Sequence, residues 1–241
     1  MVTAARRQRE LLARERLILD TARRMLAERG YLGLNMDRIA EAIEYSKGTI
    51  YQHFSSKEDL IAALCNDTAE ARAGMFRQAA AFDGKTRERV LAIGIADAIF
   101  IKRHPDHFAV ESILDLESIV GKITEERREK WIRTKTEMMD VLKGIVGDAI
   151  AAGDLHIRND LPLCAPLYGL WTQSVGHYRI ISSDPLEPFE GIDLHAILWN
   201  NYNMMLDGYG WKPLSAEWDY RASAECISKT VFGETMSMGT G

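Results

Sequence analysis

A short segment near the N-terminus carries side chains that can form hydrogen bonds in several directions. Lys47, Thr49 and Gln52 offer donors, or donor and acceptor pairs, from a predicted short helix. The apolar residues Ile50 and Phe54 mark its buried side. Side chains of these types read the edges of base pairs when a helix carries them into the major groove of DNA. The chemistry that this segment predicts is recognition of double-stranded DNA.

Signatures of other chemistry are missing from the chain. It has no Gly-x-Ser-x-Gly, His-Glu-x-x-His, P-loop or Gly-x-Gly-x-x-Gly motif, so we predict that it is not an enzyme and needs no cofactor. His104 and His107 are separated by a proline, which favours a helix break over a metal site. Cys65, Cys164 and Cys226 are far apart and odd in number, which favours buried reduced thiols over disulfides or zinc ligands. We therefore expect no metal.

The charge is distributed unevenly along the chain. The whole sequence of 241 residues has a formal net charge of -5, but residues 1–60 carry 11 Lys and Arg against 9 Asp and Glu. The basic residues are densest at the start, where we expect Arg6, Arg7 and Arg9 to form a flexible arm for the minor groove or phosphates; the alternative is a solvated first helix with salt bridges. No signal peptide or apolar stretch long enough for a membrane is present. We expect a cytoplasmic protein that does not interact with membranes.

The elements that must position the polar segment are helices. Apolar residues recur at helical spacing from Arg16, and Gly30 follows where the first helix is expected to end, near Arg29. Asn35 can cap a short second helix, and Ser46 can cap the third. For the fourth helix two capping boxes are possible, namely Ser55 with Glu58 or Ser56 with Asp59.

The rest of the chain shows helical periodicity and no convincing strand, so the predicted fold class is all-α. Further helices are expected at 87–103, 106–120, 124–152, 161–182, 192–208 and 215–231. We predict two domains, a DNA-binding domain at 1–60 with a basic N-terminal arm and a helical effector-binding and dimerisation domain at 61–241. A continuous helix from Ser56 toward Phe76 is expected to join them.

A set of residues at fixed spacing resembles the tetracycline-repressor (TetR) family of bacterial transcription regulators. The match runs without a gap from about Arg16 to Leu64. Its most specific positions are Gly30, Tyr31, Met36, Asp37, Ile39, Ala40, Ser46, Lys47, Gly48, Thr49, Ile50, Tyr51, His53, Phe54, Ser56, Lys57, Glu58 and Leu60. The resemblance implies a helix-turn-helix head whose second helix enters the major groove.

The resemblance also implies roles for single residues. The expected DNA-binding residues are Asn35, Ser46, Lys47, Gly48, Thr49, Tyr51, Gln52, His53 and Lys57. Gly48 leaves room for a phosphate at the helix N-terminus, Tyr51 and His53 touch the sugar-phosphate backbone, and Lys57 contacts a phosphate. Ile43 and Glu44 stand where the family has a small residue and glycine. A positive φ at Glu44 would be strained, so the turn is expected to differ in shape, and the carboxylate would repel DNA.

Members of this family act as homodimers on palindromic operators, and their bodies hold small molecules. We expect Leu163, Leu167, Leu170, Ile197, Leu198 and Met205 at the dimer interface. An apolar or aromatic effector would be lined by Phe100, His104, Phe108, Trp131, Met138, Trp171 and Tyr178, although each of these also suits an ordinary core. The predicted function is a ligand-responsive regulator, most simply a repressor; the alternative is a regulator controlled by a protein partner.

Overall fold

A computed structural model describes residues 2–104, 121–181 and 189–234 of the chain, and these residues form helices and connections without a strand. This confirms the all-α fold class. The helices are α1 (Val2–Gly33), α2 (Met36–Ala42), α3 (Lys47–His53), α4 (Lys57–Ala80), α5 (Thr86–Arg103), α8 (Glu125–Ala151), α9 (Ala165–Ile181), α10 (Leu194–Gly208) and α11 (Tyr220–Phe232). The predicted helix at 106–120 lies outside the described residues.

The chain divides into two compact units, and each unit consists of two separate segments of the sequence. Unit 1 comprises Met1–Ala73 together with Phe100–Thr136, and unit 2 comprises Gly74–Ile99 together with Glu137–Gly241. Helices α4, α5 and α8 therefore each contain residues of both units. The predicted boundary at residue 60 stays a prediction.

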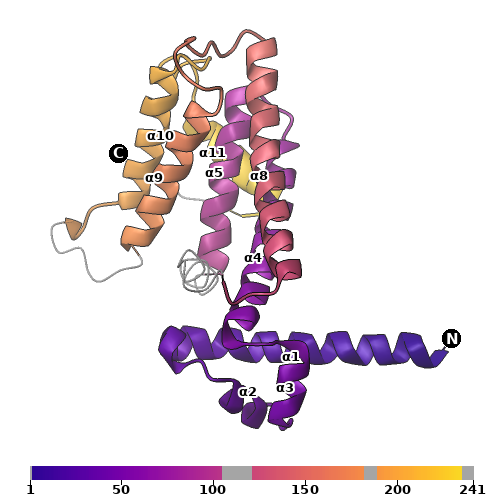
Figure 1. Cartoon of the computed structure of the whole chain (residues 1–241). Coiled ribbons are helices and arrows are strands. Elements are labelled where there is room, and N and C mark those ends of the chain that lie inside the picture. The colour runs from indigo at the N-terminus through magenta and orange to yellow at the C-terminus, as the bar shows by residue number, and fades with distance from the viewer. Residues whose placement is uncertain (1, 105–120, 182–188, 235–241) are drawn as a thin grey trace. The chain divides into compact units, whose positions relative to one another are not determined.

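In unit 1, α2 and α3 lie together on one side of the long helix α1 (Figure 1). The apolar sides of these three helices and of the start of α4 form a common core. Its fully buried members include Ile18, Ile39, Ile50, Phe54 and Leu60. Apolar residues at helical spacing on these four helices thus bury one continuous cluster, which fixes the orientation of α3 within the unit.

Helix α1 begins much earlier than predicted. It is helical from Val2, so the expected flexible arm is wrong for Arg6, Arg7 and Arg9, which lie on exposed helical turns. The segment is free of Gly and Pro and rich in Ala, Arg, Glu and Leu, which are good helix formers. Gly30 has φ 63° and interrupts the helix close to the predicted end.

Of the two predicted capping boxes, the start of α4 uses the one of Ser56 with Asp59. The Ser56 hydroxyl accepts a hydrogen bond from the Asp59 backbone N–H at 3.0 Å, as one box predicts. The Asp59 carboxylate accepts the backbone N–H of Ser55 at 3.1 Å, one residue before the position that the box requires. Side chains of this segment thus satisfy one backbone donor in the first turn of α4 and one just before the helix.

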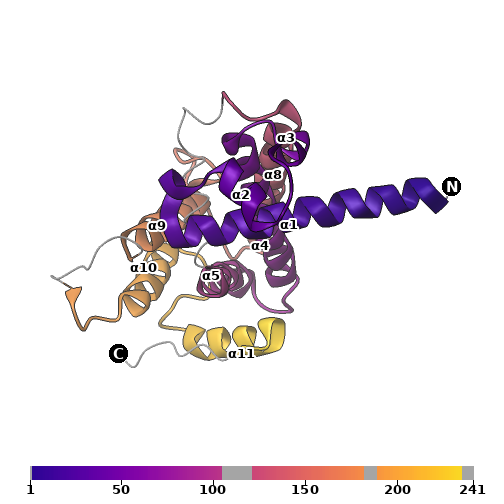
Figure 2. The same ribbon diagram turned by 90° about the horizontal axis from the view of Figure 1, so that it is seen from below.

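In unit 2, α9 and α10 pack side by side (Figures 1 and 2). Helix α11 starts at the Asp219 carboxylate, which accepts the backbone N–H groups of Arg221 and Ala222, and ends at Gly233 with φ 66°. A fully buried arginine, Arg87 of α5, forms an ion pair with Asp207 of α10 at 2.5 Å. Nothing in the helical periodicity of α5 distinguishes this arginine from a solvated one.

Other sequence predictions have mixed outcomes. The helices after residue 80 begin and end within about five residues of the predicted positions where they are described. Cys65 is buried as expected, but the prediction is wrong for Cys164 and Cys226, which are exposed. Within the described ranges no three His, Cys, Asp or Glu side chains are grouped to hold a metal ion. None of the helices in those ranges has the length and apolar character that a membrane crossing needs.

Candidate nucleic-acid interface

Side-chain caps set the starts of both short helices in the head. The Asn35 side chain accepts the backbone N–H of Asp37 at 2.8 Å, and the Ser46 hydroxyl accepts that of Thr49 at 3.1 Å. The hydroxyls of Ser46 and Thr49 also share a hydrogen bond of 2.8 Å. Helices of seven residues are marginal by themselves, so these caps and the buried core define where α2 and α3 begin.

The turn between α2 and α3 uses a left-handed residue. Glu44 has φ 58° and is the one non-glycine residue with positive φ in the described part of the chain. The Tyr45 N–H donates to the Ala40 carbonyl at 3.0 Å, and the Glu44 N–H donates to the Glu41 carbonyl at 3.2 Å. This pair of bonds is a Schellman motif, which normally places glycine at the position of Glu44. The expected change of turn shape is therefore wrong: the turn keeps the glycine conformation, and the predicted strain lies at Glu44.

Helix α3 presents two distinct sides. Ile50 and, just after the helix, Phe54 are completely buried in the core of unit 1. Lys47, Gly48, Tyr51 and Gln52 are exposed, whereas Thr49 and His53 are partly buried. Of the three residues predicted to read base edges, Lys47 and Gln52 thus lie on the exposed side of the helix, whereas Thr49 is partly buried. Because the buried anchors fix α3, the exposed donors are held in a constant arrangement.

Gly48 has no packing reason to be glycine. A Cβ atom built on it would meet only the Ser46 hydroxyl, at an ordinary contact distance of 3.7 Å. Its backbone does not adopt a positive φ. The space above Gly48 is therefore left open by the protein itself, which agrees with the close approach of an external group such as a phosphate.

Lys47 already has an anionic partner in the absence of DNA. Its ammonium group lies 2.8 Å from the Asp37 carboxylate and 5.9 Å from the centre of the Tyr51 ring. The hydrogen bond with Asp37 raises the pKa of Lys47 above its usual value. Both partners of this pair are about half exposed, with side-chain exposures of 59% and 48%, so exchanging Asp37 for a phosphate or a base edge costs little.

Lys57 has partners within the protein, and its predicted contact with a phosphate stays a prediction. Its ammonium group donates a short hydrogen bond to the Tyr31 carbonyl and lies 3.8 Å from the centre of the Tyr31 ring. Burial lowers the pKa of Lys57. The tyrosine hydroxyl in turn donates to Glu58 at 3.4 Å. In the free protein Lys57 therefore ties the end of α1 to the start of α4.

The sequence reasoning missed a clamp on the end of α3 that comes from α8. Arg127 forms an ion pair with Asp59 at 3.0 Å and donates to the His53 carbonyl at 3.4 Å. Its guanidinium also lies 3.7 Å from Glu15 and 4.9 Å from the centre of the Phe54 ring. One side chain thus contacts the first, third and fourth helices of the head. No local spacing could reveal it, because Arg127 and Asp59 are far apart in the sequence.

Further contacts join the segment around Arg127 to α4. Asp59, whose side chain is only 3% exposed, also accepts hydrogen bonds from the backbone N–H and the hydroxyl of Thr124, at 3.3 and 3.0 Å. Asn66 of α4 donates to the Arg127 carbonyl at 3.0 Å, and Lys122 forms an ion pair with Glu58 at 3.2 Å. The first turns of α8 therefore belong to the same unit as the helix-turn-helix.

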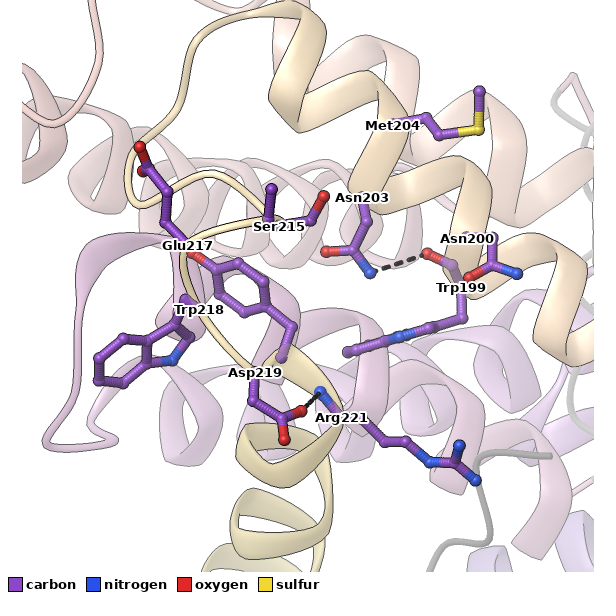
Figure 3. A pocket seen from close by; sticks show the side chains of 11 residues that line it. Trp199, Asn200, Asn203, Met204, Ser215, Glu217, Trp218, Asp219 and Arg221 are labelled. Carbon is purple, nitrogen blue, oxygen red and sulfur yellow. Dashed lines mark hydrogen bonds between the residues drawn. The ribbon is translucent and has the colours of Figure 1, made fainter. Parts of the chain in front are cut away.

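The predicted effector-pocket residues are distributed over both units. Phe100 is buried and stacks obliquely on His104 with ring centres 5.1 Å apart, and Trp131 packs against the core of unit 1. In unit 2, Met138 is partly buried, Tyr178 is buried and Trp171 is half exposed. Phe108 lies outside the described residues. None of the six described residues lines the cavity of unit 2 that is shown in Figure 3.

The predicted dimer residues are likewise mixed in exposure. Leu163 and Ile197 are exposed, Leu170 and Met205 are partly buried, and Leu167 and Leu198 are buried within unit 2. Further large apolar side chains are exposed on α9, namely Tyr168, Trp171 and Ile180. Trp171 and Tyr168 contact each other with ring centres 6.2 Å apart.

Comparison with known proteins agrees with the geometry of the head. Residues 18–64 match the model of the "Bacterial regulatory proteins, tetR family". The HTH-type transcriptional repressor AcnR of Corynebacterium diphtheriae is 45% identical over 60 residues, which are 25% of this chain and 32% of AcnR. The chain thus matches about a third of the length of this repressor. The fatty acid metabolism regulator protein of Bacillus subtilis is 26% identical over 149 residues, covering 61% of this chain and 73% of that protein.

Solved structures extend the likeness to the whole fold. A transcriptional regulator of the TetR/AcrR family from Thermobifida fusca has a TM-score of 0.62 at 24% identity, over 82% of this chain and 98% of that one. FadR of Bacillus subtilis, solved in complex with stearoyl-CoA, has a TM-score of 0.62 at 18% identity, over 80% and 97% of the two chains. The head, residues 18–64, is thus similar in sequence to the TetR family of bacterial regulatory proteins, and the chain as a whole is similar in fold to a solved regulator of the TetR/AcrR family.

Proposed function

We propose that this protein is a sequence-specific DNA-binding regulator that represses transcription from a palindromic operator and is released by a small apolar or aromatic effector. The observation that carries the proposal is α3, whose buried anchors Ile50 and Phe54 hold Lys47, Tyr51 and Gln52 in an exposed and fixed arrangement. The repressor AcnR, which is similar over the same head, supports the direction of regulation. Residues 1–60 provide the DNA-binding domain.

On DNA, Lys47 exchanges its carboxylate partner Asp37 for an acceptor on a base or phosphate. Tyr51 and Gln52 reach the groove from the next turn, and the open backbone at Gly48 accepts a phosphate. Ser46, Thr49 and Asn35 act through the caps that fix the two helices, and His53 holds the end of α3 through its carbonyl. Before DNA arrives, the Lys47 ammonium group is held by its ion pair with Asp37.

Dimerisation through α9 and α10 provides the second half-site reader. The exposed apolar side chains Tyr168, Trp171 and Ile180 on α9 and Ile197 on α10 support this interface, because adjacent large apolar side chains are rarely left to water. A two-fold symmetric pair places two recognition helices on half-sites about 34–36 Å apart. Sedimentation of the purified protein should give twice the mass of the chain, and Trp171→Glu should give the single mass.

A small-molecule effector is supported by relatives of similar fold. FadR of Bacillus subtilis was solved with stearoyl-CoA, and a fatty acid metabolism regulator of the same organism is similar over most of its length. We propose that the effector of this chain is likewise an apolar molecule that binds the helical body (61–241) and lowers affinity for the operator. Coupling of this kind is typically worth about 1–3 kcal/mol.

The test is selection from random duplex DNA, followed by affinity measurements across salt concentrations. We expect a palindromic site, with Tyr51→Ala and Gln52→Ala each weakening binding by about tenfold or more. Lys47→Ala should weaken binding as well. Its control is Lys143→Ala, because Lys143 is an exposed lysine of α8 that also pairs with a neighbouring aspartate, at 3.3 Å. Binding that is independent of sequence and equal in all variants would contradict the proposal.

The same experiment distinguishes two roles of Lys57. If Lys57 contacts a phosphate on DNA, Lys57→Ala should reduce the slope of log affinity against log salt by about one. If it only ties α1 to α4 through the Tyr31 carbonyl, the salt slope should stay constant while the melting temperature falls.

A further inference from the structure

Unit 2 contains a cavity of about 800 Å³ between α10 and the segment that leads into α11 (Figure 3). This volume is within the range of about 300–1,000 Å³ that is usual for small-molecule sites. Three aromatic residues, Trp199, Trp218 and Tyr220, line it, together with the exposed side chain of Met204. The cavity thus offers apolar and aromatic contact area to a ligand.

Buried polar contacts fix the inner wall of the cavity. The guanidinium of Arg87 is completely buried and donates to the carbonyl and the side-chain oxygen of Asn203, at 3.1 and 3.2 Å. It also donates to the carbonyls of Trp211 and Pro213, at 2.8 and 3.1 Å, and lies 4.4 Å from the centre of the Tyr220 ring. A buried charge is costly unless its partners are held in place, so this arrangement keeps α10, the loop and α11 in one geometry.

The opposite wall is also held. The indole N–H of Trp218 donates to Glu88 at 3.2 Å and to the Ser223 hydroxyl at 3.0 Å, and this hydroxyl donates to the same Glu88 carboxylate at 2.6 Å. Glu88 is buried, with 7% of its surface exposed. The cavity is therefore already formed in the absence of a ligand, which lowers the entropic cost of binding.

The unpaired polar side chains at the cavity are two pure donors, the Trp199 indole and the Arg221 guanidinium, and the Asn200 amide, which can donate or accept. Within the described part of the chain, the side chains of Trp199, Asn200 and Arg221 have no hydrogen-bond or ion-pair partner. By contrast, the two carboxylates at the cavity are engaged by backbone N–H groups. Glu217 accepts from Leu214 at 2.9 Å, and Asp219 caps α11. The unpaired donors favour an acceptor that carries negative charge, because a guanidinium binds a carboxylate through two parallel hydrogen bonds.

We propose that this cavity binds a small organic carboxylate with a planar, apolar body. Arg221 and Asn200 hold the carboxylate, and Trp199, Trp218 and Met204 contact the body. The proposal concerns binding alone and does not depend on the proposed operator recognition. It assigns an anionic ligand to a cavity that none of the described residues predicted for an effector lines.

The test uses 2-naphthoate as the probe and its neutral amide, 2-naphthamide, as the matched ligand. In calorimetry with the full-length protein we expect 2-naphthoate to bind with a Kd below about 1 mM, a bound that suits a ligand of this size. Arg221→Gln should weaken 2-naphthoate by about tenfold or more and leave 2-naphthamide within twofold. Lys229→Gln, which removes a charge from the last turn of the same helix, should change neither affinity.

A spectroscopic measurement locates the ligand. The protein has five tryptophans, so ¹⁵N-labelled indole groups give five N–H signals, which Trp199→Phe and Trp218→Phe assign. We expect 2-naphthoate to shift the signals of Trp199 and Trp218 and to leave that of Trp131 in place. The proposal is overturned if 2-naphthoate fails to bind, if Arg221→Gln binds it as tightly as the parent protein, or if these two signals do not move.

Discussion

Removing the guanidinium of Arg127 is the sharpest perturbation of the head that the structure suggests. Arg127 is 21% exposed and its partner Asp59 is 3% exposed, so Arg127→Ala leaves a buried carboxylate without its ion pair. Leaving one member of a buried pair alone costs about 3–5 kcal/mol. Asp59 keeps hydrogen bonds from Ser55 and Thr124, which compensate part of this loss. We therefore expect a loss of about 1–3 kcal/mol in the free energy of unfolding.

For a chain of this length, 1 kcal/mol corresponds to a change of about 2–4 °C in melting temperature, so the expected decrease is roughly 2–12 °C. DNA affinity should fall as well, because Arg127 holds the His53 carbonyl and the Phe54 ring at the end of α3. Arg127→Lys keeps the charge but loses the fork that reaches several partners. It should recover only part of both losses.

The neighbouring arginine offers a matched control. Arg128 is 47% exposed and pairs with Glu125 one turn away, so Arg128→Ala should cost about 0.5 kcal/mol or less. Melting temperature and affinity for the selected operator are measured for all three variants. A double-mutant cycle combines Arg127→Ala with Asp59→Asn. The changes in the free energy of unfolding should be strongly non-additive. If Arg127→Ala melts and binds DNA as Arg128→Ala does, the clamp contributes nothing and the reasoning is refuted.

Further outcomes are expected for changes at Glu44, Ser46 and His177. Glu44→Gly should melt at a higher temperature than Glu44→Gln, because both remove the charge but only glycine relieves a left-handed strain of about 1 kcal/mol; equal melting temperatures would argue against strain. Both variants should bind operator more tightly than the parent protein if the Glu44 carboxylate repels phosphates. Ser46→Ala should lower the free energy of unfolding by about 1 kcal/mol through loss of the cap, as measured in urea, whereas Ser55→Ala should have a smaller effect. Burial and the neighbouring His195 lower the pKa of His177 to about 4, so the unfolded chain binds more protons there than the folded one between pH 6.5 and 4. Stability should therefore fall as the pH decreases through this window, and a His177→Gln variant that shows the same fall would exclude this residue as its source.

The sequence predicted the local features of the head because their causes are local. Asn35 and Ser46 cap helices a few residues away, and Ile50 and Phe54 follow helical spacing, so a short window contains all the necessary information. The conformation of Glu44 could not be read in the same way. The bonds from Tyr45 and Glu44 to α2 enforce a left-handed residue there, and they outweigh the preference of glutamate.

Contacts between distant segments were beyond the sequence. Arg127 and Arg87 look like solvated arginines on amphipathic helices, and only the fold reveals that their partners lie more than 60 and 110 residues away. For the N-terminal arginines, the prediction was wrong about the backbone conformation. Their charge suggested an arm, but helix propensity without Gly or Pro determines the backbone. Two of the three cysteines were placed wrongly because position in the sequence carries no signal of burial.

The composition of unit 1 limits how this protein can exchange its DNA-binding part with relatives. Because the unit joins Met1–Ala73 with Phe100–Thr136, a recombination event with one crossover transfers the helix-turn-helix without Lys122, Thr124 and Arg127. Such a chimera would leave Asp59 facing a foreign segment. Evolution of new operator specificity is therefore easier through substitutions on the exposed turns of α3 than through replacement of the whole head. Engineered regulators built from this chain should transplant both segments together.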